Sequence, residues 1–226
     1  MSLPVRFLLA ALLLFSSGCA KTIPFRATEL TPTRPLSAAQ LTRERWNSVD
    51  GAVLMRQSAL FEFAGLRVPV AGLMKLDPAS KSARLVGLND MGVKLYDISV
   101  SATASTANFV LPELARYAKF PEAVALSMRR IFLAPEPEPG DKLTRSATSY
   151  LLSRDSSACK LRFSFGGADA QLLEKSCRGG AESWRVRYYQ YQNYLGRLYP
   201  GGIVLDDDRA GYRLTLWIEN VEKSDE

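Results

Sequence analysis

The sequence contains no histidine among its 226 residues. This absence excludes Ser-His-Asp and Cys-His nucleophile pairs, zinc sites with imidazole ligands and the most common general base. An enzyme would have to work through carboxylates, lysine, tyrosine or a Ser-Lys pair. We therefore predict that the protein is not an enzyme, and we expect neither a cofactor nor a bound metal.

Long apolar runs are also scarce, and one of them stands at the amino terminus. Arg6 provides a positive charge, residues 7–15 form an apolar stretch, and residues 16–18 are small and directly precede Cys19. This order is typical of an export signal. The apolar stretch is too short to span a bilayer as a permanent helix. An ordinary secretory signal cut nearby is the alternative, and either signal places the domain outside the cytoplasm.

Cysteine is scarce as well, with three residues, and the first has a distinctive position. Small residues before Cys19 resemble the lipobox of bacterial lipoproteins, although the usual box has leucine where this chain has Ser16. The resemblance implies that diacylglycerol is attached to the Cys19 thiol and that cleavage makes Cys19 the new amino terminus. Several acyl chains anchor a protein firmly, because each buried methylene contributes about 0.8 kcal/mol. In such lipoproteins, an aspartate directly after the cysteine favours retention in the inner membrane. This chain has Ala20 at that position, so the resemblance implies that the protein is anchored in the outer membrane.

The composition divides the chain into three parts. Residues 1–18 are the predicted lipoprotein signal peptide. Residues 19–35 are the lipidated terminus and a flexible tether, because prolines recur there and apolar periodicity is weak. Residues 36–226 are long enough for one domain with a substantial core.

The mature chain has a mild excess of positive charge. The formal net charge of the full sequence is +6, and removal of the signal takes away Arg6, which leaves +5. This excess suits a neighbour of anionic lipid head groups, and it equally suits a protein that is simply soluble.

Helical patterns open the domain and interrupt its strands. Ser37 and Gln40 have the spacing of a capping box, which predicts a helix through about Trp46. After residue 111, an amphipathic segment with Pro121 in its middle predicts two short helices. The alternating prolines and glutamates of residues 134–140 end this helical segment.

Alternation of apolar and polar residues predicts strands over most of the remaining chain. The predicted strands cover residues 52–63, 66–76, 83–88, 93–100, one ending near 111, 143–153, 160–165, 171–176, 182–191, 202–205 and 212–221. Their connections are too short for parallel crossovers. We therefore predict an α+β fold that is mainly antiparallel β: a curved, half-open β-barrel with helices covering its concave face.

The two remaining cysteines flank one predicted hairpin. If this hairpin folds about Ala168, Cys159 and Cys177 lie directly opposite each other. An oxidising compartment favours a structural disulfide there, which would contribute about 3 kcal/mol. Two buried free thiols are the alternative, whereas the spacing excludes a redox pair of the C-x-x-C type.

Two stretches of the chain carry a family resemblance. They are Gly72-Leu73-Met74-Lys75-Leu76-Asp77 and the segment from Arg84 to Leu95, Arg-Leu-Val-Gly-Leu-Asn-Asp-Met-Gly-Val-Lys-Leu. With Cys19, the proline-rich segment and the long run of strands, they resemble the LolA/LolB-type lipoprotein carriers, and more closely an uncharacterised branch of bacterial outer-membrane lipoproteins with the same fold. The resemblance implies an exposed leucine that contacts the membrane, for which Leu66 is the candidate.

The same resemblance implies an apolar cavity that accepts acyl chains. Large apolar side chains with few polar partners suit such a site, and methionine adapts to varied ligands. The candidates that line it are Met55, Phe61, Phe63, Met74, Leu76, Leu85, Leu95, Trp184, Tyr188, Leu214 and Leu216, and those that close it are Phe120, Met128 and Phe132. A dry packed core is the alternative, because alternation predicts it equally well.

Three other patterns have an ordinary structural interpretation that we favour. Ser157 and Lys160 have the Ser-x-x-Lys spacing of activated serines but lack the companion motifs. Residues 206–208 are three aspartates, suited to calcium or to a hairpin turn. The Tyr- and Arg-rich residues 184–199 could stack on nucleic acid, but a strand face or a lipid contact fits an exported protein better, so we expect no nucleic-acid partner.

These features together predict a lipid-anchored binding protein on the periplasmic face of the outer membrane. Its ligand would be a lipoprotein or another acylated molecule. A structural adapter that contacts an envelope protein, with the same fold but no cavity, is the alternative. An enzyme acting on lipid or polysaccharide ranks third.

Overall fold

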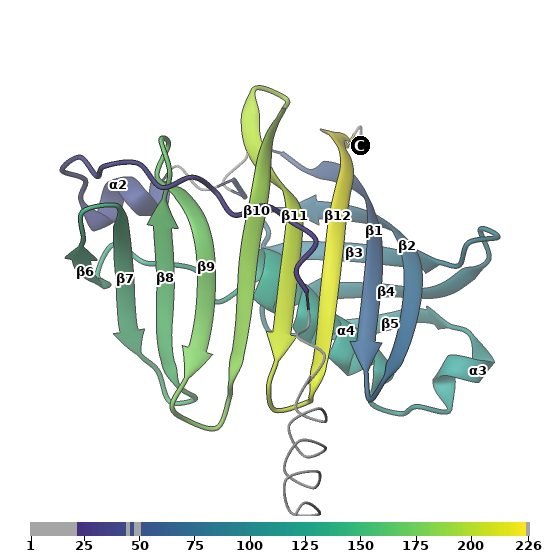
Figure 1. Ribbon diagram of the computed structural model, residues 1–226. Coiled ribbons are helices and arrows are strands. Elements are labelled where there is room, and N and C mark those ends of the chain that lie inside the picture. Colours follow the sequence, from purple (N-terminus) through teal and green to yellow (C-terminus); the bar gives the residue numbers. More distant parts are fainter. Residues whose placement is uncertain (1–21, 44–45, 48–50, 225–226) are drawn as a thin grey trace, which may run out of the picture.

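The computed structural model describes residues 22–43, 46–47 and 51–224. Twelve strands form one antiparallel sheet in the order β5-β4-β3-β2-β1-β12-β11-β10-β9-β8-β7-β6 (Figure 1). The first and last strands, β1 (Val53–Phe63) and β12 (Tyr212–Lys223), pair in the middle of the sheet. The edges, β5 (Ser105–Val110) and β6 (Lys142–Arg145), remain apart, so the sheet does not close.

The first block of strands confirms the predicted alternation. It continues from β1 and ends at β5 through β2 (Leu66–Asp77), β3 (Ser82–Leu88) and β4 (Lys94–Ser101). In Figure 1, the strands β3, β4 and β5 run nearly perpendicular to β7–β12, so the sheet curves strongly. Mainly antiparallel β structure with few helices is therefore the observed architecture.

The second block contains seven strands. They are β6, β7 (Ser149–Asp155), β8 (Lys160–Gly166), β9 (Gln171–Arg178), β10 (Trp184–Tyr194), β11 (Arg197–Asp207) and β12. The single strand predicted over residues 143–153 is wrong. Ser146 ends β6 in a turn, because its hydroxyl accepts a hydrogen bond from the Ser149 amide at 3.0 Å and its own amide binds the Ser149 carbonyl at 2.8 Å.

The strand predicted at residues 202–205 is much longer in the structure. It begins at Arg197, directly after the two-residue turn Leu195-Gly196, where both residues have positive φ angles of 54° and 75°. Pro200 and the following glycines hid this extension, because neither residue type favours strands.

The helical elements follow the predicted starts, but the first helix ends at Arg43, and Trp46, which was expected to be helical, lies in a turn. Before α2 (Ala38–Arg43), the Ser37 amide donates to the Gln40 side chain at 2.8 Å and the Gln40 amide donates back to the Ser37 hydroxyl at 3.3 Å, which confirms the capping box. The later segment contains α3 (Pro112–Ala115) and α4 (Phe120–Met128), as two short helices were predicted. A π-helical turn, η1 (Arg129–Leu133), extends α4 and was not predicted.

The sheet has two distinct faces. The inner face carries Met55, Met74, Ile98 and Phe163, all fully buried in one core cluster with side chains of α4 and η1. The other face, which we call the outer face, looks toward the viewer in Figure 1 and lies under residues 22–35.

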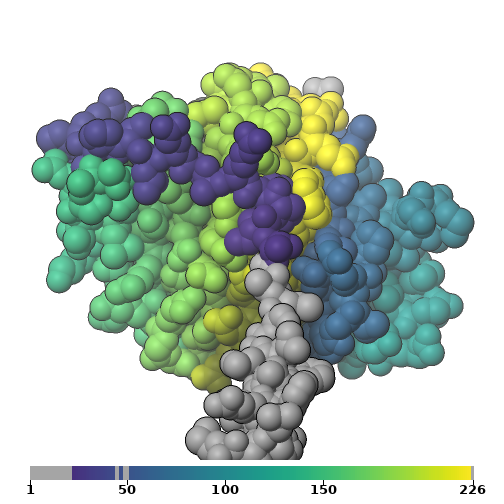
Figure 2. All heavy atoms as spheres, in the orientation of Figure 1, coloured from purple at the N-terminus to yellow at the C-terminus, as the bar shows by residue number. Residues whose placement is uncertain are grey.

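Residues 22–35 correct the prediction of a free tether. The segment is extended, as expected, but it lies against the outer face, and Phe25 is only 8% exposed there (Figure 2). Prolines therefore produced an extended conformation without detaching the segment from the domain. The predicted signal peptide and Cys19 lie outside the described residues.

The predicted disulfide is present, but the predicted register is wrong. Cys159 and Cys177 are bonded with their Cα atoms 5.4 Å apart. Cys177 pairs with Leu161 in the ladder, so the bridge runs diagonally to a residue before β8. The hairpin turns between Ala168 and Asp169, which shifts the pairs by one residue, and an irregularity between Ser164 and Phe165 shifts them by one more; sequence alternation reveals neither.

Candidate functional site

The fourteen predicted cavity residues all lie at or around the inner face. Nine are buried in the main core cluster: Met55, Met74, Leu76, Leu85, Met128, Phe132, Trp184, Tyr188 and Leu216. Four are half-buried and pack against that cluster: Phe61, Leu95, Phe120 and Leu214. The last, Phe63, is 45% exposed. In this structure the protein's own side chains therefore fill the centre of the inner face.

The apolar surface of the inner face reaches solvent at the tip of the β1–β2 hairpin. Phe63, Leu66 and Val68 are 45%, 66% and 43% exposed. Phe63 pairs with Leu66, and two residues further Phe61 pairs with Val68, so these side chains share the face of the buried Met55–Met74 pair. We call Phe63, Leu66 and Val68 the apolar rim.

The rim is continuous with the core behind it. The Phe61 ring lies 6.4 Å from that of Phe63 and 5.4 Å from that of Tyr212, measured between ring centroids. Leu214 pairs with Phe61, Val70 lies diagonally to Phe61 on the other neighbouring strand, and both pack against the core. An apolar path therefore runs from solvent to the interior without an intervening charged side chain among these residues.

Sequence reasoning found most of this site but missed part of it. Phe61, Phe63, Leu66 and Leu214 were singled out, and the structure brings them together. Val68 and Val70 were missed, although they alternate with Arg67 and Pro69 in the way expected of a strand face. Leu66 was considered only as a membrane contact.

The helical segment packs on the inner face beside this site. Ser127 of α4 shares a hydrogen bond of 2.7 Å with the Tyr212 hydroxyl, and Tyr188 donates to the Ile131 carbonyl of η1 at 2.8 Å. Phe120 packs edge-on against Tyr96 at 5.4 Å. Burial raises the pKa of Tyr96 to about 12 and also raises the pKa of Tyr212, so both phenols are neutral at physiological pH.

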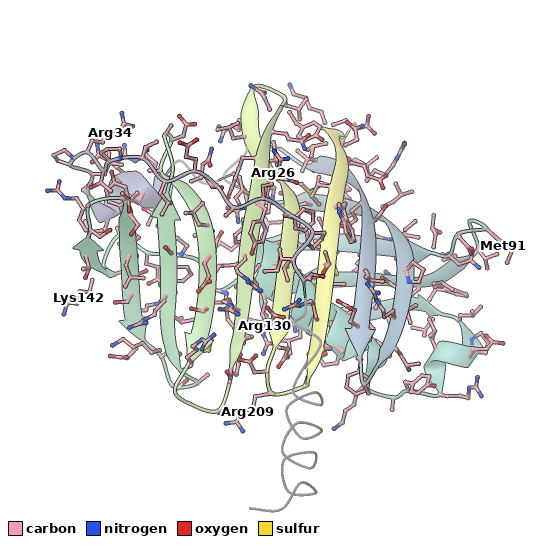
Figure 3. All side chains as sticks on the ribbon, in the orientation of Figure 1. Arg26, Arg34, Met91, Arg130, Lys142 and Arg209 are labelled. Carbon is pink, nitrogen blue, oxygen red and sulfur yellow. A yellow bond between two sulfur atoms is a disulfide. The ribbon has the colours of Figure 1, made fainter. Side chains whose placement is uncertain are left out.

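A buried ion pair fixes the end of this segment. Arg130 of η1 is 5% exposed and donates to Asp207 at 2.6 Å and to Glu182 at 3.0 Å. Its guanidinium lies 5.3 Å from the centre of the Trp184 ring, and the indole of Trp184 donates to Glu182 at 2.7 Å. Figure 3 shows Arg130 at the lower middle of the sheet, near β10 and β11. Charges buried this deeply are stable only when paired, so the contact holds η1 in one position.

The weaker patterns have structural explanations. Ser157 and Lys160 lie at a surface hollow of about 450 Å³ on either side of the bonded Cys159, and Lys160 begins a strand rather than a helix. The hollow is lined by polar and basic residues, including Arg162 and Arg178. Ser157 and Lys160 therefore lack the helical setting that an activated serine of this type requires.

Asp206 and Asp207 bind arginines at the end of β11, and Asp208 begins the predicted turn. Asp207 accepts hydrogen bonds from the amides of Arg209 and Ala210, which closes the β11–β12 connection. Burial opposes ionisation of Asp206, but hydrogen bonds and charges of Arg213 and Arg187 outweigh it, so the pKa of Asp206 is lowered. No cluster that could hold a metal occurs within residues 22–43, 46–47 and 51–224.

The Tyr- and Arg-rich stretch covers β10 and the start of β11, and β10 has two different faces. Trp184 and Tyr188 are buried on the inner face, so they offer no surface on which bases could stack. Arg187 points the other way, toward Asp206.

Comparison with solved structures assigns the fold. A LolA superfamily protein from Nitrosomonas europaea matches with a TM-score of 0.56 at 10% identity, over 85% of this chain and 96% of that chain. A domain assigned to outer membrane lipoprotein sorting, from Vibrio parahaemolyticus, matches with a TM-score of 0.53 at 14% identity, over 82% and 90%. A DUF1329 family protein from Desulfovibrio piger matches with a TM-score of 0.53 at 7% identity, over 83% and 90%.

The chain therefore has a LolA/LolB-like fold, which confirms the resemblance read from the sequence. No family model matches the sequence, and no curated protein matches it. Among the described residues, no helix has both the length and the apolar character needed to cross a bilayer.

Proposed function

We propose that this protein is a lipid-anchored binding protein of the bacterial cell envelope, which receives or transfers a lipoprotein or another acylated molecule. The apolar rim is the observation that carries this proposal. Exposed apolar side chains that adjoin one another are costly unless they meet a ligand, a membrane or a partner. The LolA/LolB-like fold supports the same function, because one match with this fold is assigned to lipoprotein sorting.

In this proposal the sheet is a half-open barrel, and α4 and η1 are its cover. An acyl chain first contacts Phe63, Leu66 and Val68 at the rim. It reaches the predicted cavity residues only when α4 moves away from the sheet while η1 stays fixed by Arg130, because the interior is filled in the described conformation. The path past Phe61 and Leu214 offers apolar contact along the way.

The domain boundaries and location belong to the same proposal. Residues 1–18 are removed as a signal peptide, Cys19 carries the lipid, and residues 36–226 form one domain on the periplasmic face of the outer membrane. Mass spectrometry of the protein purified from membranes tests this step. We expect the mass of an acylated Cys19 at the amino terminus, and its loss together with membrane association in Cys19→Ala.

Binding of a fluorescent fatty acid to the mature chain tests the ligand. The Cys19→Ser form avoids interference from the protein's own lipid. We expect saturable binding that Leu66→Ser weakens about tenfold, because the leucine contributes about 1.5 kcal/mol or more when its side chain leaves water. Leu73→Ser is the matched control, since Leu73 is an exposed leucine on the outer face of the same strand.

The adapter function remains the second candidate because the interior is packed. Nine predicted cavity residues are buried against one another and against the cover. If the mature chain shows no saturable probe binding, the rim is instead a contact surface for an envelope protein, and the carrier function must be abandoned.

A further inference from the structure

Residues 22–35 follow a defined course across the outer face. Figure 2 shows this segment lying over the second block of strands. In Figure 3, Arg26 lies over the middle of the sheet and Arg34 lies near α2 at its far side. The segment has neither helix nor strand structure, so contacts with the sheet must hold it.

An aromatic socket holds its first part. The Phe25 ring stacks on Tyr189 with ring centroids 5.6 Å apart and lies 5.5 Å from the Trp217 ring. Val204, which is fully buried, forms the floor of this small second cluster. A phenylalanine buried in this way contributes roughly 1.5–3 kcal/mol relative to an exposed one.

Three glycines beneath the segment make room for it: Gly202 and Gly166 lie in strands, and Gly167 lies in the β8–β9 turn. A Cβ atom on Gly202 would lie 2.5 Å from the Phe25 ring. On Gly167 it would lie 2.9 Å from Thr28, and on Gly166 it would lie 2.9 Å from Leu30. Glycine weakens a strand interior, so the use of Gly202 inside β11 indicates that close approach of the Phe25 ring is part of the fold.

Hydrogen bonds fix the far end. The Thr33 amide donates to the Ala147 carbonyl at 2.9 Å, and the Thr33 hydroxyl donates to the Ser146 carbonyl at 2.8 Å. The Tyr150 hydroxyl accepts from the Arg34 amide at 3.0 Å and donates to the Arg34 carbonyl at 2.8 Å. The segment is therefore held at both ends and in its middle.

We propose that residues 22–35 are a pinned spacer whose Phe25 socket sets how close the domain lies to the bilayer and turns the outer face toward it. The docking of residues 22–35 on the outer face follows from the observed contacts alone. The membrane distance rests on the proposed lipidation of Cys19. The partner of the outer face is then the phospholipid surface that holds the anchor.

Chain length gives the size of the effect. Cys19 precedes Phe25 by six residues, which span at most about 20 Å when fully extended. If the whole segment were free, Cys19 would precede the start of the domain at Leu36 by seventeen residues, or at most about 60 Å. Seating Phe25 therefore shortens the reach of the anchor about threefold.

Trypsin cleavage after Arg26 tests the docking without any membrane. The Arg26 side chain is exposed, so trypsin can reach it. The peptide bond after Arg26 is protected only because the segment around it must detach from the sheet before cleavage. In the mature Cys19→Ser chain, we expect Phe25→Ala to speed this cleavage about tenfold. Gly202→Ala should do the same from the opposite side of the contact, because its methyl group expels the Phe25 ring.

Matched controls exist for both variants. Phe109 is an exposed phenylalanine of β5, and Gly140 has open space around the position of a Cβ atom, so Phe109→Ala and Gly140→Ala should leave cleavage at Arg26 unchanged. Equal cleavage rates in the wild type and in Phe25→Ala would overturn the pinned spacer.

Fluorescence energy transfer from the protein to acceptors in lipid vesicles tests the distance between the domain and the bilayer. The lipidated protein carries a fluorophore at Lys75→Cys, an exposed position of the outer face, and the phosphatidylethanolamine–phosphatidylglycerol vesicles carry acceptor head groups. We expect strong transfer that Phe25→Ala reduces and Phe109→Ala does not. Unchanged energy transfer in Phe25→Ala would overturn the spacer role. If instead the wild-type protein does not bind vesicles but remains protected from trypsin at Arg26, only the lipidation of Cys19 is overturned.

Discussion

The two faces of the sheet are covered by segments that are held in different ways. The helical cover of the inner face is fixed by a buried ion pair, in which Arg130 binds Asp207 and Glu182. The segment on the outer face is fixed by Phe25 in an aromatic socket and by hydrogen bonds near Thr33. A buried charge has a high energy without its partner, whereas an apolar ring can leave its socket at moderate cost. We therefore expect residues 22–35 to be released locally, and we expect η1, which Arg130 fixes, to leave the inner face only with wider unfolding.

The largest expected effect is that of Arg130→Ala. It leaves Asp207 buried without its main partner, so the free energy of unfolding should fall by about 3–5 kcal/mol. Chemical denaturation measures this loss. Arg129→Ala is the neighbouring control, expected to cost about 1 kcal/mol, because its partner Glu122 is largely exposed. Equal losses in the two variants would show that the buried ion pair of Arg130 contributes no more than the largely exposed pair of Arg129.

The next effect is that of Phe25→Ala on global stability. We expect a loss of about 2 kcal/mol or less, smaller than a core phenylalanine would give, since the segment can detach while the sheet persists. The same denaturation experiment measures it. A loss as large as that of Arg130→Ala would mean that the outer segment is an integral part of the core.

The Arg84–Asp97 ion pair lies outside both covers, and the dependence of its contribution on acid pH provides a reference for the larger effects. Arg84 binds Asp97 through two hydrogen bonds of 2.8 and 2.7 Å, and this contact is the main reason that the pKa of Asp97 is lowered to about 2. A lowered pKa stabilises the fold above the usual value near pH 4, and this stability is lost as the pH falls through about 2. The contribution should be about 1 kcal/mol, because Arg84 is 59% exposed and solvent screens the pair.

Denaturation curves between pH 2 and pH 5 check this expectation. Asp97→Asn should lose part of the pH dependence in that window and should be less stable than the wild type only at the upper end. Parallel curves for the two proteins would show that the pair contributes nothing.

The smallest effect on stability is expected at the rim. Replacing Phe63, Leu66 and Val68 by serine one at a time should change the free energy of unfolding by about 0.5 kcal/mol or less, because all three are substantially exposed. Probe binding should nevertheless weaken in each. Large losses of stability at these positions would show that the rim belongs to the folded core and not to a binding site.

Features encoded by neighbouring residues could be predicted from the sequence. The Ser37–Gln40 capping box and the strand alternation of Met55 and Phe61 depend on spacings of two or three residues, and both are observed. The disulfide partners could be predicted too, because one hairpin brings them together. Their register could not, since alternation shows neither the exact centre of the turn nor the irregularity between Ser164 and Phe165.

Contacts between distant residues could not be predicted. Phe25 finds its socket near Gly202 and Trp217, and nothing in a proline-rich segment identifies those partners. The Arg130–Asp207 pair likewise joins residues that only the fold brings together. The rim was predicted in part, because alternation assigns Phe61 and Phe63 to one face and Leu66 was expected only as a membrane contact. Alternation does not show that the helical cover leaves the hairpin tip exposed.

Photo-crosslinking with a diazirine-bearing fatty acid tests the central claim most directly, because the label records where an acyl chain lies on the protein. The mature chain is irradiated with the probe, digested and mapped by mass spectrometry. We predict labelling within residues 61–70 of the β1–β2 hairpin, competed by unlabelled fatty acid. Labelling confined to the outer face around Tyr189 and Trp217, or none above background, would contradict the account.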